Sequence, residues 1–284
     1  MVYQWVKEKM KNNQLVLLID NDGLIEKAKK VGISTFLFPV KGYSVGFKKA
    51  YEIEEIKEEA FLYINRNLTN TDIDNLKTIF CNLNDNIKGV VFEDLGLINI
   101  LKNTNLIKIY DCRHLNCSYL SVNALLGFVD SVILSTDVTE SEMKVIMKNA
   151  SKKISLYTFG LNRIMYSRRT LLSNYTKEYN LDKKEEKDVV EKVTKQKFKV
   201  IENELGTVFY PEKFYDGLKL FSYDALYYIV NMAFLSVEDQ DVLLNNFKDN
   251  NYVADGITSK TSSYFLDEET YYKLPPKEEE RWKR

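Results

Sequence analysis

Short runs of apolar and β-branched residues recur along this chain, and they limit its possible folds more than any other feature. Seven runs come early, at Leu15–Ile19, Thr35–Phe38, Phe61–Ile64, Val90–Phe92, Leu106–Tyr110, Val132–Leu134 and Ile154–Phe159, and an eighth comes late, at Ala225–Val230. Continuous apolar runs of this length are typical of strands buried on both faces of a parallel sheet. The pattern predicts eight βα units in a (β/α)8, TIM-barrel-like fold, with an open doubly wound sheet as the alternative.

Segments with helical spacing lie between these runs. Helices are predicted at Asp72–Phe80, Ser118–Phe128, Glu140–Met147, Glu212–Phe221 and Val237–Phe247. Thr139 followed by Glu142 has the pattern of a capping box, which predicts that the third of these helices begins just after Thr139. Strands that alternate with helices in this way favour one α/β domain over residues 1–284.

A long stretch, residues 160–211, separates the seventh run from the next predicted helix. Structureless loops of this length are uncommon in compact domains, so the stretch is interpreted as an inserted, lid-like subdomain. Its middle, Lys177–Lys199, is dense in Lys and Glu and predicts a solvated helix or a linker. Its end predicts a hairpin that turns near Gly206. The last residues, 275–284, predict a flexible tail.

Composition excludes several classes of protein. Forty Lys and Arg against 41 Asp and Glu leave a net charge of -1, so no global basic field points to nucleic acid. The single histidine, His114, excludes a metal site built on several His. The three cysteines cannot all pair, and no apolar run approaches the ~20 residues of a membrane span. We therefore expect a cytoplasmic protein that does not enter a membrane.

In a barrel of this type, chemistry is expected where each strand feeds its following loop. The polar residues at those positions are Asp20, Asn21, Asp22, Lys41, Asn65, Arg66, Glu93, Asp94, Asp111, Arg113, His114, Thr136, Asp137 and Asn231. Many such residues simply cap helices or lie in wet loops. Glu93 and Asp94 form the sharpest pair, because two adjacent carboxylates would raise each other's pKa or bind a cation or an arginine.

The segment from Asp111 to Cys117 places an acid, a base and two thiols within seven residues. A Cys–His nucleophile pair is conceivable there, although cysteines are more often buried and inert. Two Cys and one His fall short of a structural zinc site unless Asp111 joins them, so no metal is expected.

Three arginines of the insertion, Arg163, Arg168 and Arg169, would lie over the mouth of such a barrel. Guanidinium groups bind carboxylates or phosphates through two hydrogen bonds. The alternative is that these arginines pair with Glu93, Asp94 or Glu202 and hold the insertion in place.

One run within this region is GLNRIMYSRRTLLSNY, at residues 160–175. It resembles the signature of peptidase family U32, the collagenase-like proteins. Further similar stretches are KGYSVGF at 41–47, LYINRNLTNTDIDNL at 62–76, VVFEDLGLI at 90–98, SYLSVNALLGFVDSVILSTDVT at 118–139 and FKVIENELGTVF at 198–209. The resemblance spans most of residues 15–209.

The resemblance implies an α/β barrel with the signature region beside the active mouth. Members of the family are peptidases or factors in the anaerobic hydroxylation of RNA or quinone precursors. Several of the hydroxylation factors carry an iron–sulfur cluster on four cysteines, one of them in the signature region, where this chain has Thr170. No cysteine follows Cys117, so four thiolates cannot gather there, and no cofactor is expected.

These observations together predict a U32-type peptidase of unclassified catalytic type that acts on peptide or protein substrates. The predicted catalytic residues are Glu93, Asp94, Asp111 and His114, and the predicted substrate-binding residues are Asn65, Arg163, Arg168, Arg169 and Glu202. The alternatives are an RNA-modifying or RNA-binding factor, which would use the arginines and Lys177–Lys199 against phosphates, and a non-catalytic barrel that binds a ligand.

Overall fold

The computed structural model describes residues 14–267, with gaps at 114, 116, 183–185, 194, 249 and 264–265. The expected tail at 275–284 lies outside the described residues, as does His114. No helix in the described part of the chain is long and apolar enough to cross a membrane.

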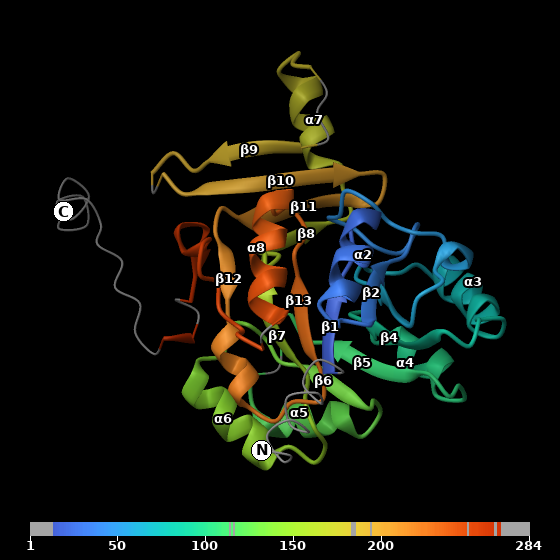
Figure 1. Cartoon of the computed structure of the whole chain (residues 1–284). Helices are drawn as coiled ribbons and strands as arrows, with labels where there is room; N and C mark the ends of the chain where they lie inside the picture. Colours follow the sequence, from blue (N-terminus) through green and yellow to red (C-terminus); the bar gives the residue numbers. More distant parts are fainter. Residues whose placement is uncertain are drawn as a thin grey trace, which may run out of the picture.

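Eight parallel strands form the centre of the molecule, and each coincides with one of the predicted apolar runs (Figure 1). They are β1 (Leu15–Leu18), β2 (Thr35–Pro39), β3 (Ala60–Ile64), β4 (Ile87–Phe92), β5 (Ile107–Asp111), β6 (Ser131–Ile133), β7 (Leu156–Gly160) and β13 (Tyr228–Asn231). In β1, β3, β7 and β13 every residue is buried, because helices or the sheet interior cover both faces. The fold is therefore a mixed α/β fold with a large parallel sheet.

The strand order follows the chain without reversal. It runs β7-β13-β1-β2-β3-β4-β5-β6, whereas a doubly wound sheet reverses its order at a switch point. The pairing does not continue as a ladder from β6 back to β7. At that gap a single isolated bridge joins Ile133 to Ser155. The carboxyl end of β7 pairs instead with a short antiparallel strand, β12 (Phe214–Asp216).

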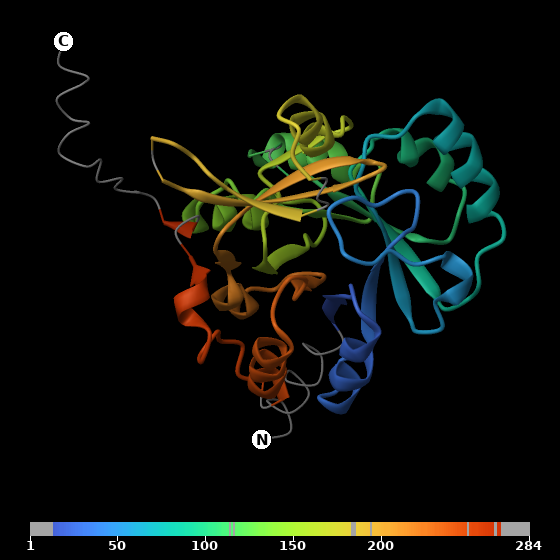
Figure 2. The same cartoon turned by 90° about the horizontal axis from the view of Figure 1, so that it is seen from above.

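Helices follow the strands as the spacing predicts, and side chains cap four of them, at Asn21, Thr69, Ser118 and Thr139. They are α2 (Asp22–Lys30), α3 (Asn70–Phe80), α4 (Gly96–Leu101), α5 (Tyr119–Leu126), α6 (Glu140–Asn149) and α8 (Val237–Lys248). Figure 2 shows them around the sheet. Thr139 and Glu142 form the predicted capping box at α6, and Thr69 with Asp72 forms another at α3.

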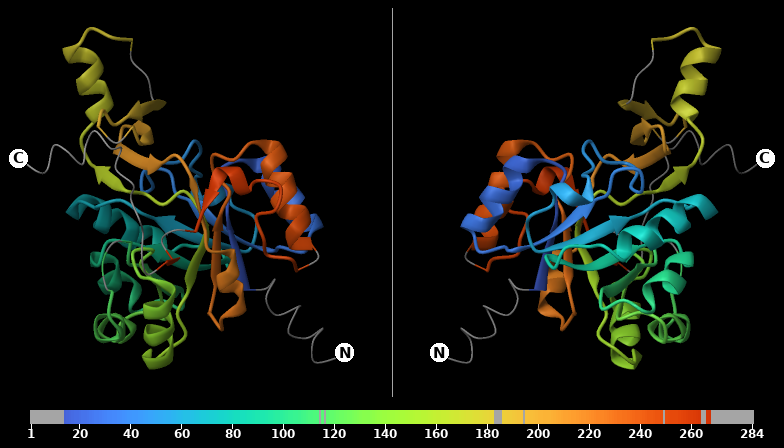
Figure 3. Two further views of the ribbon diagram at one scale, coloured as in Figure 1. Left: turned by 90° about the vertical axis from the view of Figure 1, so that its left-hand side faces the viewer. Right: turned by 90° about the vertical axis from the view of Figure 1, so that its right-hand side faces the viewer.

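The stretch between β7 and β12 forms a second, four-stranded sheet. Its order is β8-β11-β10-β9, with β8 at Met165–Ser167, β11 at Gly206–Pro211, β10 at Lys197–Asn203 and β9 at Glu186–Val190, and α7 (Leu171–Glu178) lies against it. The hairpin predicted near Gly206 is confirmed by the antiparallel pairing of β10 with β11. Figure 3 shows this sheet and α7 at one end of the molecule and α5 and α6 at the other.

Two predicted segments have a different structure. Lys177–Lys199, predicted as a solvated helix or a linker, contains strand β9, whose side chains alternate between exposed and half-buried; this alternation, rather than the density of charge, is what a strand requires. The segment Glu212–Phe221 forms β12 and a 3-10 helix, η2 (Leu218–Ser222), with Gly217 between them. Further 3-10 turns are η1 (Ile53–Glu55) and η3 (Thr258–Lys260), and β14 (Thr261–Ser262) pairs with β12.

Candidate functional site

Glu93 lies at the centre of a charged cluster at the carboxyl ends of the parallel strands. It is the first residue after β4, and its side chain is only 14% exposed. The Nε of Arg113 lies 3.0 Å from its Oε1, and an Nη of Arg163 donates to its Oε2. One buried carboxylate is therefore held between two guanidinium groups, of which Arg113 follows β5 and Arg163 follows β7.

Arg113 joins Glu93 to a second carboxylate. Its Nε lies 3.1 Å from Oδ2 of Asp111, and its backbone N–H donates to Oδ1 of Asp111 at 3.2 Å. The hydroxyl of Tyr63 donates to Asp111 at 2.9 Å and accepts a hydrogen bond from Arg113. Arg113 has a φ of 49°, a left-handed conformation uncommon for arginine, and this turn folds its side chain back over the strand ends.

Arg163, which lies between β7 and β8, ties this segment to the strand ends. Its Nη1 donates to the backbone carbonyl of Asn65 at 2.7 Å. The amide of Asn65 in turn pairs with both backbone groups of Val45, at 2.8 and 3.1 Å. Asn65 thus contributes its carbonyl to the cluster, while its side chain fixes the loop after β2. The sequence allowed Arg163 either to bind a substrate anion or to pair with a carboxylate of the chain. The structure shows it paired with Glu93.

Burial dominates the electrostatics of the cluster. It raises the pKa of Glu93 to about 8, with Arg163 acting in the opposite direction and Asp111 adding to the rise. Burial, reinforced by the nearby charge of Arg163, lowers the pKa of Arg113 to about 10. A carboxyl group whose pKa is this close to neutrality can both accept and donate a proton.

Asp94 does not share the surroundings of its neighbour. Its two oxygens accept hydrogen bonds from the backbone N–H groups of Leu68 and Gly96, each at 2.9 Å. Asp94 therefore secures the first turn of α4, and the second carboxylate near Glu93 is Asp111 instead.

The remaining predicted site residues lie apart from Glu93. Glu202 accepts hydrogen bonds from the backbone N–H groups of Leu172 and Ser173, at 2.6 and 2.9 Å, and thereby holds the start of α7. Although burial opposes its ionisation, hydrogen bonds from the hydroxyls of Ser173 and Thr207, together with these backbone N–H groups, lower the pKa of Glu202. Arg168 and Arg169 are exposed, and within the described part of the chain their guanidinium groups have no ion pair or hydrogen bond.

The cysteines of the segment from Asp111 to Cys117 lie in different surroundings. Cys112 is buried, and Cys81 and Cys117 are exposed free thiols. Among the described residues, no three His, Cys, Asp or Glu side chains gather as metal ligands would.

Two residues of the cluster were not among the predicted site residues. Arg113 stands at a strand end in the sequence, but its role depends on a left-handed turn that no local pattern indicates. Tyr63 is the fourth residue of β3 and looks like a core residue, since its ring is 3% exposed and its hydroxyl alone reaches the cluster.

Asn162 is a further residue of interest, because it lies next to Arg163 and is 4% exposed. Neither its amide nitrogen nor its amide oxygen has a hydrogen-bond partner among the described residues. Buried amides are normally hydrogen-bonded, so this side chain is an unsatisfied donor and acceptor beside the cluster.

Fold and site together define an α/β protein with paired carboxylates and guanidinium groups at the carboxyl ends of parallel strands. Residues 46–238, well over half of the chain, match the sequence profile described as peptidase family U32. The chain belongs to this family, as the signature region had indicated.

The other comparisons show only distant likeness. A chitinase from Chromobacterium violaceum is 7% identical, with a TM-score of 0.39, over 84% of this chain and 99% of that one. The C-terminal domain of a Desulfitobacterium hafniense protein assigned as a chitinase is 9% identical, with a TM-score of 0.42, over the same shares of the two chains. No curated protein matches the sequence.

Proposed function

We propose that this chain is a peptide hydrolase of the U32 type whose reacting centre is Glu93 with Arg113 and Arg163. The observation that carries the proposal is a carboxyl group buried at the strand ends, with a pKa raised to about 8, between two guanidinium groups. Cleavage of a peptide bond needs a group that takes a proton from water and returns one to the leaving amine. It also needs positive charge where the carbonyl oxygen becomes negative.

The residues of the cluster divide these tasks between them. Glu93 transfers the proton, and the guanidinium groups of Arg113 and Arg163 stabilise the developing oxyanion. Asp111 acts as a positioning residue, because it holds both the backbone N–H and the Nε of Arg113. Asn162 offers a donor and an acceptor, which match the carbonyl and N–H of a substrate peptide group.

The proposed architecture is a (β/α)8, TIM-barrel-like ring. The sequential strand order and the bridge between Ile133 and Ser155 at the gap support it. Catalytic groups of such rings lie at the carboxyl ends of the strands, where β4 and β5 deliver Glu93 and Asp111. The β8–β11 sheet would then act as a lid beside this mouth. The exposed thiols of Cys81 and Cys117 are compatible with a cytoplasmic location.

The test is cleavage of a peptide library prepared from a denatured proteome, read by mass spectrometry. We expect the full chain to generate new peptide termini and the Glu93→Gln variant to generate none above background. Equal cleavage by the two proteins would contradict the assignment of Glu93. No cleavage by the unaltered chain, under conditions in which the protein is folded, would contradict peptidase activity itself.

A second candidate, a binding protein without turnover, is favoured by one specific observation. Glu93 and Asp111 are already paired within the chain, as in a structural ion-pair network. In that case the library would be retained by the immobilised protein without being cut. The RNA-binding alternative rests on the exposed guanidinium groups of Arg168 and Arg169 and predicts a salt-dependent mobility shift of RNA.

A further inference from the structure

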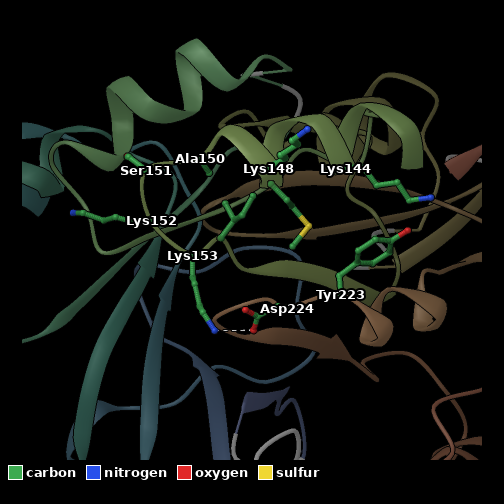
Figure 4. A pocket seen from close by; sticks show the side chains of 10 residues that line it. Lys144, Lys148, Ala150, Ser151, Lys152, Lys153, Tyr223 and Asp224 are labelled. Atoms are coloured by element: carbon green, nitrogen blue, oxygen red, sulfur yellow. Dashed lines mark hydrogen bonds and ion pairs between the residues drawn. The ribbon is translucent and has the colours of Figure 1, made fainter.

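A hollow of about 510 Å³ lies away from Glu93, and Figure 4 shows the residues that line it. It is formed by the end of α6, the residues that lead into β7, and the residues Tyr223 and Asp224 that follow η2. These segments precede β7 and β13, whereas Glu93 follows β4. Because the strands are parallel, the hollow and the Glu93 cluster lie at opposite strand ends.

Positive charge dominates the lining of the hollow. The lining includes four lysines, Lys144, Lys148, Lys152 and Lys153, and one acid, Asp224; in Figure 4 only Lys153 points toward Asp224, and the other three lysines point away from it. Lysine ammonium groups are compact, mobile point charges that suit phosphate oxygens. Asp224 and the neighbouring Glu140 each pair with one of these lysines, and the remaining surplus of two positive charges (four minus two) favours an anionic ligand with more than one negative charge.

These lysines differ in how far they are already engaged. Lys153 pairs with Asp224 at 2.7 Å, and Lys144 pairs with Glu140 at 3.1 Å. Lys152 donates to the backbone carbonyl of Val129 at 2.8 Å. Lys148 has no ion pair among the described residues, so its charge is not neutralised within the chain. The lysines are exposed, so each side chain could turn toward a ligand without disturbing the packing of the core.

The base of the hollow is apolar. Met147, Ala150 and Ile154 line it, and Ile154 is 1% exposed. Tyr223 adds an aromatic ring at the margin, held in place by a hydrogen bond from its hydroxyl to Glu140. A methionine and a tyrosine beside an apolar surface form good contacts with a flat ring.

We propose that this hollow binds an organic phosphate that carries an aromatic ring, of the nucleoside diphosphate kind. The phosphates would lie among the four lysines, and the ring would contact Met147 and Tyr223. A volume of about 510 Å³ is within the range of small-ligand sites and far exceeds the space of one inorganic ion. Since the hollow lies at the other strand ends from Glu93, this ligand is not the proposed substrate, and the proposal is independent of peptidase activity.

The test is calorimetric titration of the full chain with ADP, pyrophosphate and adenosine at low salt. We expect ADP to bind more tightly than either of the other two, because it alone has both charged phosphates and a ring, and its affinity should fall as salt rises. Removal of one lysine should weaken ADP binding by up to about fivefold, the worth of an exposed ion pair. Lys148→Ala should show this loss, and Lys148→Ala with Lys152→Ala should weaken binding by up to about 25-fold.

The matched control is Lys197→Ala, on β10 at the other end of the molecule, which should leave the ADP affinity unchanged. Three results would each overturn the proposal. The first is that ADP does not bind at low salt. The second is that adenosine binds as tightly as ADP. The third is that Lys197→Ala loses as much ADP affinity as the Lys148→Ala, Lys152→Ala double variant. Thermal unfolding of each variant verifies that a lost affinity does not reflect lost folding.

Discussion

Replacing Glu93 by Gln and Arg163 by Met, separately and together, measures how strongly this buried pair is coupled. Its side chains are 14% and 9% exposed, so water screens the two charges little. At an effective dielectric constant of ~20, unit charges ~4 Å apart interact by about 4 kcal/mol. Removing one partner also leaves the other buried and unpaired. We therefore expect a coupling energy of about 3–5 kcal/mol at pH 9, where Glu93 is ionised.

The assay is urea unfolding followed by circular dichroism, for the unaltered chain, both single variants and the double variant. These four proteins form a double-mutant cycle. The hydrogen bond that Arg163 also donates to Asn65 does not contribute to the coupling energy, because Arg163→Met removes it whether or not Glu93 is present. Below pH 6, where Glu93 is protonated, the coupling should fall by more than half.

The matched control is the exposed pair Lys197–Glu212, whose side chains are 58% and 56% exposed. Its coupling energy should stay below ~1 kcal/mol at both pH values. A Glu93–Arg163 coupling below ~1 kcal/mol at pH 9, or one equal to that of the control pair, would refute this reasoning.

Three further predictions concern stability. The raised pKa of Glu93 means that the folded state binds a proton which the unfolded state releases above about pH 4.5, so the free energy of unfolding should fall between about pH 4.5 and 8. Glu93→Gln should reduce this fall by on the order of 2 kcal/mol, and an identical pH dependence in both proteins would contradict the pKa shift. Gly160→Ala should lower the free energy of unfolding by more than ~2 kcal/mol in a urea titration, because φ is 137° and a Cβ would lie 2.3 Å from the Tyr157 hydroxyl; a change below ~0.5 kcal/mol would count against this backbone geometry. Thr139→Ala removes the cap of α6 and should cost about 1 kcal/mol by the same measurement, whereas an unchanged midpoint would mean that the capping box contributes nothing.

The parallel strands could be predicted because each is a local signal. An apolar run such as Leu15–Leu18 has no solvent-facing side and therefore needs cover on both faces. The helices α3 and α6 carry their caps in the sequence, at Thr69 and Thr139. The edge strands were harder to predict, since β9 is stabilised by pairing with β10 rather than by its own composition.

The site was predicted only in part, because its geometry depends on contacts distant in sequence. Glu93 and Asp94 are equivalent in a list of strand-end residues, but adjacent residues of an extended chain point to opposite sides. Only Glu93 reaches the arginines, while Asp94 accepts hydrogen bonds from the backbone. The contact between Arg163 and Glu93 spans 70 positions, and no local pattern specifies such a pairing.

The most direct test compares two neighbouring carboxylates on a peptide that the protein cleaves. If Glu93 is the proton-transfer group, Glu93→Gln should lower kcat/KM by at least about 100-fold, the usual contribution of general acid–base catalysis. Asp94→Asn, which alters only the carboxylate that secures α4, should keep kcat/KM within about threefold. A large loss in the Asp94 variant together with full activity in the Glu93 variant would contradict the account.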